Sequence, residues 1–436
     1  MIAPPYNYCV RHAPRFPLAA AILSLILLGA GAAAQRRDAF VASRDHAAIR
    51  YTATDPTDPV AALNRRLQSG AVTLKFDQAN GYLRSLLDAL AVPMESQSLV
   101  FSKTSFQAEK INYRNPRAVY FNDTVSVGWV RGGDILEVAA QDPTQGVIFY
   151  ALDQKDARSP TLKRNNDCLA CHLSWNTLGV PGLMIESVHP LPDDISYVNG
   201  YTTVHASPLE QRWGGWWVTG NHGGVKHMGN IPVMPVDKGK SRLASPTRVL
   251  ATLEGQFDLA GYPTPYSDVV AQMVLAHQVR MTNMITRAGW EARLAAAAPG
   301  ADATARVREA ASELVDYLLF VDEAPFVGAM QGSSGFAEWF ATQGPHDAQG
   351  RSLREFDLRR RLFKYPCSYM IYTPAFDALP AAAKEAVYTR MWEVLSGRET
   401  RQPWASRLSA ADRQAILQIL RTTKKDLPAY MQPLRG

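Results

Sequence analysis

The chain has 436 residues and a formal net charge of +6, and 47% of its residues are hydrophobic while 20% are charged. A chain of this length and composition can bury a substantial core, in one large domain or two. Its basic clusters, such as Arg359–Arg361, lack interleaved aromatic residues and any nucleic-acid motif. This argues against binding to DNA or RNA.

The first 34 residues are typical of a signal peptide. Arg11 and Arg15 precede an uncharged apolar run, Phe16–Ala34, which ends in three alanines before Gln35. We therefore predict an exported, periplasmic protein whose leader is cleaved. The alternative is an uncleaved N-terminal anchor, because the run is close to the roughly 18 apolar residues that can span a bilayer. Membrane contact is expected only through this leader.

The region after the leader predicts short helices followed by strands. Residues 35–58 are polar and broken by prolines, which favours an extended arm. Hydrophobic periodicity then predicts two short helices and, after them, three strands that form an antiparallel meander: helices at 59–67 and 83–90, strands at 125–129, 135–140 and 146–152.

The most informative stretch is Cys168-Leu-Ala-Cys171-His172, a C-x-x-C-H motif typical of covalent haem c attachment. Two thiols three positions apart can each add to a vinyl group of one porphyrin, while the adjacent imidazole becomes the proximal iron ligand. A zinc site would need a second Cys/His pair, and Cys9 and Cys367 have no such partner. A thioredoxin-like dithiol would follow a strand, and the polar residues before the motif predict none. Leader cleavage would remove Cys9 and leave Cys367 as an unpaired, buried thiol.

The region after the motif is first loop-rich and then helical. Strand-like segments are expected at 182–188, 201–204 and 216–219, within a stretch dense in glycine and proline that we expect to form a pocket. Helices are expected from 267 onward and at 306–321, 381–395 and 410–420, the last with a capping box at Ser409 and Asp412.

Together these elements predict an α+β fold: an antiparallel β-rich N-terminal half leads into a haem-binding loop region and a helical C-terminal half. We expect four regions along the chain: a leader at 1–34, a β-rich region at 35–160, haem attachment and pocket at 161–245, and a helical region at 246–436.

The Cys168–His172 motif resembles that of c-type cytochromes, which implies one covalent haem c held by Cys168, Cys171 and His172. Over a longer span, segments 212–220, 222–230, 267–278 and 365–380 are similar to a group of large secreted bacterial cytochrome c domain proteins. That resemblance implies no particular reaction.

The chain departs from small single-haem cytochromes just before the motif. Those domains carry an aromatic residue about four positions before the first cysteine, where this chain has Arg164. Val180-Pro181-Gly182 could still serve as the family's proline segment, whose backbone carbonyl orients the proximal imidazole. The alternative is that Pro181 only shapes a turn.

The sixth iron ligand decides between electron transfer and substrate activation, because a protein ligand at that position blocks small molecules. Met228 and His277 are the main candidates, and Met234, His222 and His227 are others. His277 lies on an apolar helical stripe, so it could instead be a core histidine bonded to a backbone carbonyl.

Other residues near the expected pocket have two interpretations each. Trp213, Trp216 and Trp217 could form a wall against the porphyrin or pack as ordinary core. Arg212 and Lys226 could pair with haem propionates or be solvated.

These observations favour an exported monohaem c-type cytochrome that transfers electrons to an unknown redox partner protein. The alternative is a haem-dependent oxidoreductase or peroxidase with an open or labile sixth position, which the large size favours and the single motif disfavours. A third possibility is a structural protein whose haem is vestigial.

Overall fold

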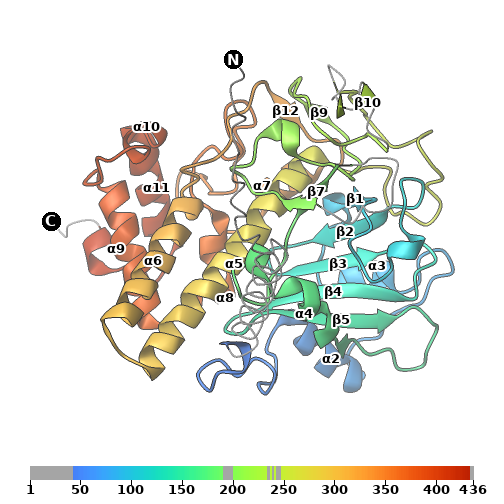
Figure 1. Cartoon of the computed structure of the whole chain (residues 1–436), viewed down its shortest axis with the longest axis horizontal. Helices are drawn as coiled ribbons and strands as arrows, with labels where there is room; N and C mark the ends of the chain where they lie inside the picture. The colour runs from blue at the N-terminus through green and yellow to red at the C-terminus, as the bar shows by residue number, and fades with distance from the viewer. Residues whose placement is uncertain (1–42, 190–199, 233–235, 238–239, 242–246, 433–436) are drawn as a thin grey trace, which may run out of the picture.

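The computed structural model describes residues 43–189, 200–232, 236–237, 240–241 and 247–432. A six-stranded antiparallel sheet lies in the N-terminal half, and helices dominate the C-terminal half (Figure 1). The predicted α+β class is thus confirmed. The predicted leader lies outside the described residues.

Within these ranges the sheet runs β1-β2-β3-β4-β5-β6, each strand antiparallel to the next. Its strands are β1 (Ser98–Val100), β2 (Arg117–Phe121), β3 (Val125–Trp129), β4 (Ile135–Asp142), β5 (Gly146–Asp153) and β6 (Lys163–Arg164). Three two-stranded ribbons pair β7 (Glu186–Val188) with β8 (Gly200–Thr202), β9 (Asn221–His222) with β12 (Met330–Gln331), and β10 (Val236–Asp237) with β11 (Lys240–Ser241).

The described helices are α2 (Pro59–Gln68), α3 (Leu83–Ala89), α4 (Leu169–His172), α5 (Val269–Ala297), α6 (Ala301–Leu318), α7 (Phe336–Thr342), α8 (Pro374–Asp377), α9 (Ala381–Leu395), α10 (Trp404–Arg407) and α11 (Ala410–Thr423). Short 3-10 turns join them, among them η3 (Asn166–Cys168), η4 (Trp175–Thr177) and η6 (Tyr369–Tyr372).

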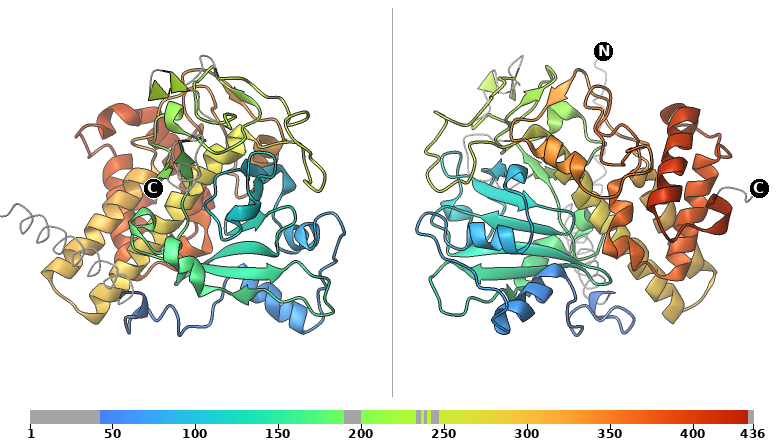
Figure 2. Two further views of the ribbon diagram at one scale, coloured as in Figure 1. Left: turned by 45° about the vertical axis from the view of Figure 1, so that its right-hand side comes forward. Right: turned by 180° about the vertical axis from the view of Figure 1, so that it is seen from behind.

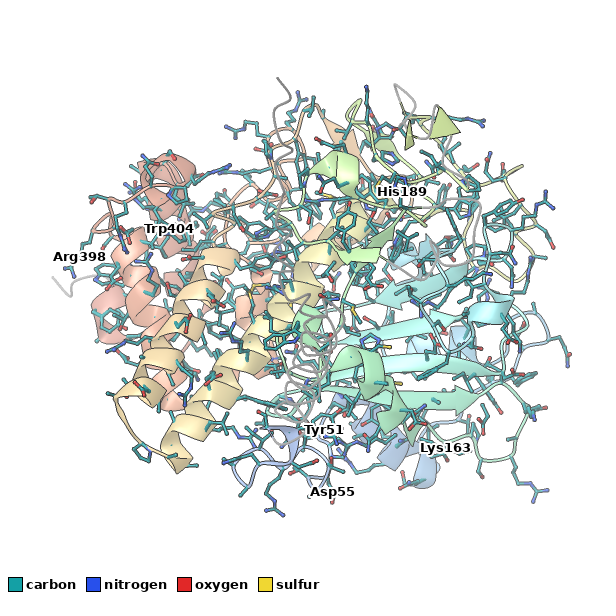
Figure 3. All side chains as sticks on the ribbon, viewed as in Figure 1. Tyr51, Asp55, Lys163, His189, Arg398 and Trp404 are labelled. Carbon is teal, nitrogen blue, oxygen red and sulfur yellow. The ribbon has the colours of Figure 1, made fainter. Side chains whose placement is uncertain are left out.

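The two faces of the sheet differ because successive residues of a strand point to opposite sides. Large apolar side chains on one face pack against α2 and α3: Tyr120, Val127, Leu136, Val138 and Leu152, with Leu63, Leu83 and Leu86. The other face carries smaller side chains around Phe149. Figure 1 shows α4 in front of this second face and α3 behind the sheet, and the rear view in Figure 2 shows α3 in front.

The long helix α5 separates the sheet from the C-terminal helices, with α6 and α9 on its far side (Figure 1). It starts where the Asp268 carboxylate accepts hydrogen bonds from Val270 N and Ala271 N, at 2.8 and 2.9 Å. Its predicted apolar stripe is buried as expected, and polar residues such as Gln272 and Asn283 are buried as well. Few side chains of α5 are therefore solvated. The helix contacts the sheet on one side and the C-terminal helices on the other.

Most predicted elements are confirmed with small shifts. Strands β3, β4 and β5 match the predicted meander, and α2, α3, α9 and α11 match the predicted short and C-terminal helices. The Ser409–Asp412 capping box is present at the start of α11. Helix α6 begins five residues before the predicted position and ends three residues earlier.

Three expectations are wrong. The described part of the arm, from residue 43, forms turns, and it packs Ile49 and Tyr51 into the core. Residues 216–219 make only isolated bridges, one of them between Val100 and Trp216. The polar residues before the C-x-x-C-H motif, for which no strand was expected, form the edge strand β6. The strands expected at 182–188 and 201–204 are confirmed in part, as the shorter β7 and β8.

The described residues contain no helix that is both long and apolar enough to cross a membrane.

Candidate haem attachment site

The C-x-x-C-H motif lies on one short helical turn. The Asn165 side chain accepts a hydrogen bond from Asp167 N at 3.0 Å and starts η3, which continues into α4. Residues three apart on a helix share a face, so Cys168 and Cys171 lie on the same side of the turn. Leu169 anchors the turn in the hydrophobic cluster of the sheet.

Both motif thiols are free in the structure. Cys171 is exposed, and Cys168 is half-buried. Burial raises the pKa of the Cys168 thiol to about 11, so this group is protonated at neutral pH. The pair therefore presents one exposed and one half-buried thiol beside His172, without a disulfide between them.

The His172 ring is held by the backbone of Gly182. His172 Nδ1 lies 2.9 Å from the Gly182 carbonyl oxygen, and Gly182 N donates to the His172 carbonyl oxygen at 3.0 Å. A carbonyl only accepts hydrogen bonds, so Nδ1 carries the proton and the neutral ring has its lone pair on Nε2. Burial lowers the pKa of His172 to about 4 despite the Gly182 bond, which keeps the ring neutral. Nε2 is therefore the atom available to a metal.

The segment that orients His172 is fixed from two sides. Val147 N of β5 donates to the Pro181 carbonyl at 3.0 Å. The Asn283 side chain of α5 accepts from Leu183 N at 3.0 Å and donates to the Leu183 carbonyl at 2.7 Å. A backbone carbonyl of the 180–182 segment thus contacts the imidazole, as expected for a proline segment. It belongs to Gly182 rather than to Pro181.

Gly182 must be small because Asn283 packs directly against it. A Cβ atom at Gly182 would lie 2.2 Å from Asn283 Oδ1. We expect Gly182→Ala to lower the free energy of unfolding by about 1–3 kcal/mol through overpacking. Urea unfolding would measure this, with Gly300→Ala as the control, because a Cβ at Gly300 meets nothing within 4 Å. Equal stability of the two variants would contradict the proposed clamp.

The sheet face under α4 carries mostly small side chains around one aromatic ring. The His172 ring lies 4.8 Å from the Phe149 ring between centroids. Cross-strand neighbours on the Phe149 side of the sheet are small: Ala139 is opposite Phe149, Ser126 is opposite Ala139, and Gly128 is opposite Glu137. Ser126 and Glu137 stay half-buried although their strands lie inside the sheet.

An arginine with spare donors lies on the same face. Arg117 Nη1 donates to Glu137 Oε2 at 2.9 Å, while Arg117 Nε is buried and has no hydrogen-bond partner among the described residues. Both side chains act electrostatically on His172, Arg117 lowering and Glu137 raising its pKa after the dominant effect of burial. A guanidinium with an unused donor suits a carboxylate, such as a haem propionate.

The structure places His277 in a separate hydrogen-bonded chain. His277 Nδ1 lies 3.0 Å from His205 Nδ1, and His277 Nε2 lies 2.7 Å from Ser368 Oγ. His205 Nε2 lies 2.8 Å from Asp322 Oδ1, and the two imidazoles are fully buried and stacked with Tyr317. His277 is thus a core histidine bonded to side chains rather than to a backbone carbonyl, and both of its ring nitrogens are engaged.

The other proposed ligands also lie apart from the motif or beyond the described residues. Met228 is buried, with its sulfur 3.9 Å from Ser187 Oγ and 4.0 Å from Tyr201 Oη. His222 and His227 meet edge to face with centroids 4.6 Å apart. They lie at and just after β9, which Figure 1 shows far above α4. Met234 lies outside the described residues.

Except for Lys226, the proposed pocket residues pack into the core. Trp213 meets the His227 ring at 5.0 Å, while Trp216 Nε1 donates to the Glu186 carbonyl and Trp217 Nε1 to the Tyr113 carbonyl. Arg212 is buried and donates to the His205 and Ser207 carbonyls. Lys226 is exposed.

Sequence reasoning found the motif and the 180–182 segment but missed the residues that support them. Phe149, Arg117 and Asn283 come from three different elements, and only the fold brings them to His172. One signal in the sequence could have found Asn283. It is a polar residue on the buried face of a helix, and buried polar groups need hydrogen-bond partners.

In the part of the chain that the structure describes, no group of three or more His, Cys, Asp or Glu side chains could hold a metal ion by itself. Comparison of the chain with family models, with curated proteins and with solved structures found no match.

Proposed function

We propose that the protein is an exported monohaem c-type cytochrome that transfers electrons. The observation that carries this proposal is the His172 Nδ1–Gly182 bond, which leaves the lone pair on Nε2, next to two free thiols on one helical turn. Cys168 and Cys171 would hold the haem through thioethers, and His172 Nε2 would be its proximal ligand. The bound haem would supply one-electron redox chemistry.

The surroundings support this proposal. Small side chains lie around Phe149 on the sheet face beside His172, and the buried Arg117 Nε, which has no partner among the described residues, would be a donor for a propionate. The carbonyl bond to Nδ1 fixes the tautomer and raises the basicity of Nε2. Cys171 is exposed, so a haem attached there would lie near the surface, where a redox partner could approach.

A second function, a haem-dependent oxidoreductase or peroxidase, is favoured by one observation. Both ring nitrogens of His277 are already bonded, and the Met228 sulfur lies among the side chains of β7 and β8. Neither main candidate for the sixth ligand therefore points to His172, which is compatible with an open or labile sixth position.

Ligand binding separates the two functions. Electron transfer by an iron with a tight protein ligand predicts that the optical spectrum of the purified ferric protein stays unchanged when cyanide is added. The spectra would be recorded before and after cyanide on protein made with c-type haem maturation machinery. A prompt spectral change in the native protein would contradict simple electron transfer and support the oxidoreductase.

A further inference from the structure

A cavity of about 280 Å³ lies between the sheet and the C-terminal helices, and no residue of the C-x-x-C-H motif lines it. Three elements line it: the β4–β5 turn, one side of α5, and the end of α8 with the residue before α9. The lining residues on which the argument depends are Thr144, Gly289, Arg293, Ala378, Leu379 and Pro380. Its size is near the lower end for small-molecule sites in proteins.

Arg293 lies at this cavity, where burial lowers its pKa and the Asp142 carboxylate partly opposes that effect from beyond ion-pair distance. Its guanidinium donates to the carbonyls of Ala48, Ile49 and Thr144 at 2.9, 2.7 and 2.8 Å. These three bonds use three of the five guanidinium N–H groups, which leaves two donors. Among the described residues Arg293 forms no ion pair, and it is half-buried. A fixed, partly desolvated cation with spare donors favours an anionic group beside it.

One wall of the cavity is apolar, while Thr144 and Thr286 add polar side chains to the lining. Ala378, Leu379 and Pro380 form the apolar wall, and Gly289 on α5 faces it, because a Cβ at Gly289 would lie 3.6 Å from the Leu379 side chain and 4.0 Å from Pro380, at ordinary van der Waals contact. A side chain larger than a methyl group at Gly289 would therefore extend into the space beside this wall.

From this combination of an anchored cation and an apolar wall, we propose that the cavity binds a small carboxylate with an apolar body, whose carboxylate pairs with Arg293. The cavity shares β5 and α5 with the segment that holds His172, since Gly146 lines it and Val147 bonds Pro181. Binding does not require haem, so this proposal can fail while the haem proposal stands.

Isothermal titration calorimetry with hexanoate tests the proposal on the full chain. We expect one hexanoate per chain, and hexan-1-ol, which has the same apolar body without the charge, should bind at least about tenfold more weakly. Gly289→Leu should lower the hexanoate affinity by about tenfold or more, because its side chain fills the cavity while leaving Arg293 in place.

The control variant is Gly300→Ala, which should bind hexanoate like the unmodified chain. Gly289→Leu adds a good helix former and is expected to fold, which circular dichroism would verify. Absence of hexanoate binding to the unmodified chain, equal binding of hexan-1-ol, or undiminished binding to Gly289→Leu would each overturn the proposal.

Discussion

The double variant Cys168→Ala/Cys171→Ala is expected to lose all covalently attached haem. Each thioether in the proposed site comes from one of these sulfurs, and both thiols are free and on one face of the same turn. The measurement is haem staining of a denaturing gel, with intact mass on the same sample, after production in cells that mature c-type cytochromes.

Two single-cysteine variants and a control variant at Cys367 extend this test. Cys168→Ala and Cys171→Ala should each retain at most one thioether, which shifts the spectrum of the haem in alkaline pyridine relative to the unmodified protein. Cys367→Ala should keep full attachment, because Cys367 is fully buried in the core that contains the C-terminal helices. Covalent haem in the double variant would place the attachment elsewhere in the chain.

Stability is expected to fall as the pH drops below about 6.5, because buried histidines stay neutral in the folded protein. Burial lowers the pKa of His277 and of His205, although the Asp322 carboxylate partly opposes the effect on His205. Burial likewise lowers the pKa of His227, to about 3. The unfolded chain takes up protons near pH 6.5 while these folded rings do not, so acid favours unfolding. Each such ring contributes a slope of up to about 1.4 kcal/mol per pH unit.

The hydrogen bonds that join His277 to His205 and Ser368 show why neither imidazole takes up a further proton. If both rings are neutral and His205 Nε2 donates to Asp322, then His277 Nδ1 donates to His205 Nδ1 and Ser368 Oγ donates to His277 Nε2. A second proton between the two Nδ1 atoms would set two N–H groups against each other at 3.0 Å.

Urea unfolding between pH 8 and pH 5 measures the effect. His277→Gln should reduce the pH slope by about the contribution of one histidine, up to 1.4 kcal/mol per pH unit. His346→Gln, at an exposed histidine, should leave the slope unchanged. A free energy of unfolding that is flat or rises toward pH 5 in the unmodified protein would refute this account.

The sequence predicted those elements whose side chains follow one clear period. Val125, Val127 and Trp129 alternate with small residues, and β3 forms as predicted. β2 was missed because Val119 and Phe121 are as apolar as Ala118 and Tyr120, so both faces look alike. The strand expected at 216–219 fails because its backbone groups bond to segments distant in the sequence instead of to one partner strand, as when Trp217 N donates to the Leu99 carbonyl.

The candidate site was predictable in its chemistry and only partly in its geometry. The motif names Cys168, Cys171 and His172, and the segment 180–182 was the expected source of a carbonyl. Which carbonyl faces the ring depends on backbone torsions that Asn283 and Val147 fix from other elements. The pairing of His277 with His205 spans 72 residues of sequence and has no local signal. Long-range contacts of this kind follow from the fold and are not encoded in a local pattern.

Intact mass spectrometry of the mature chain, purified from cells in which a control c-type cytochrome is fully matured, tests the central claim most directly. The account predicts the polypeptide mass plus one haem that persists under denaturing conditions. A chain recovered only at the mass of the bare polypeptide, beside a fully loaded control, would contradict it.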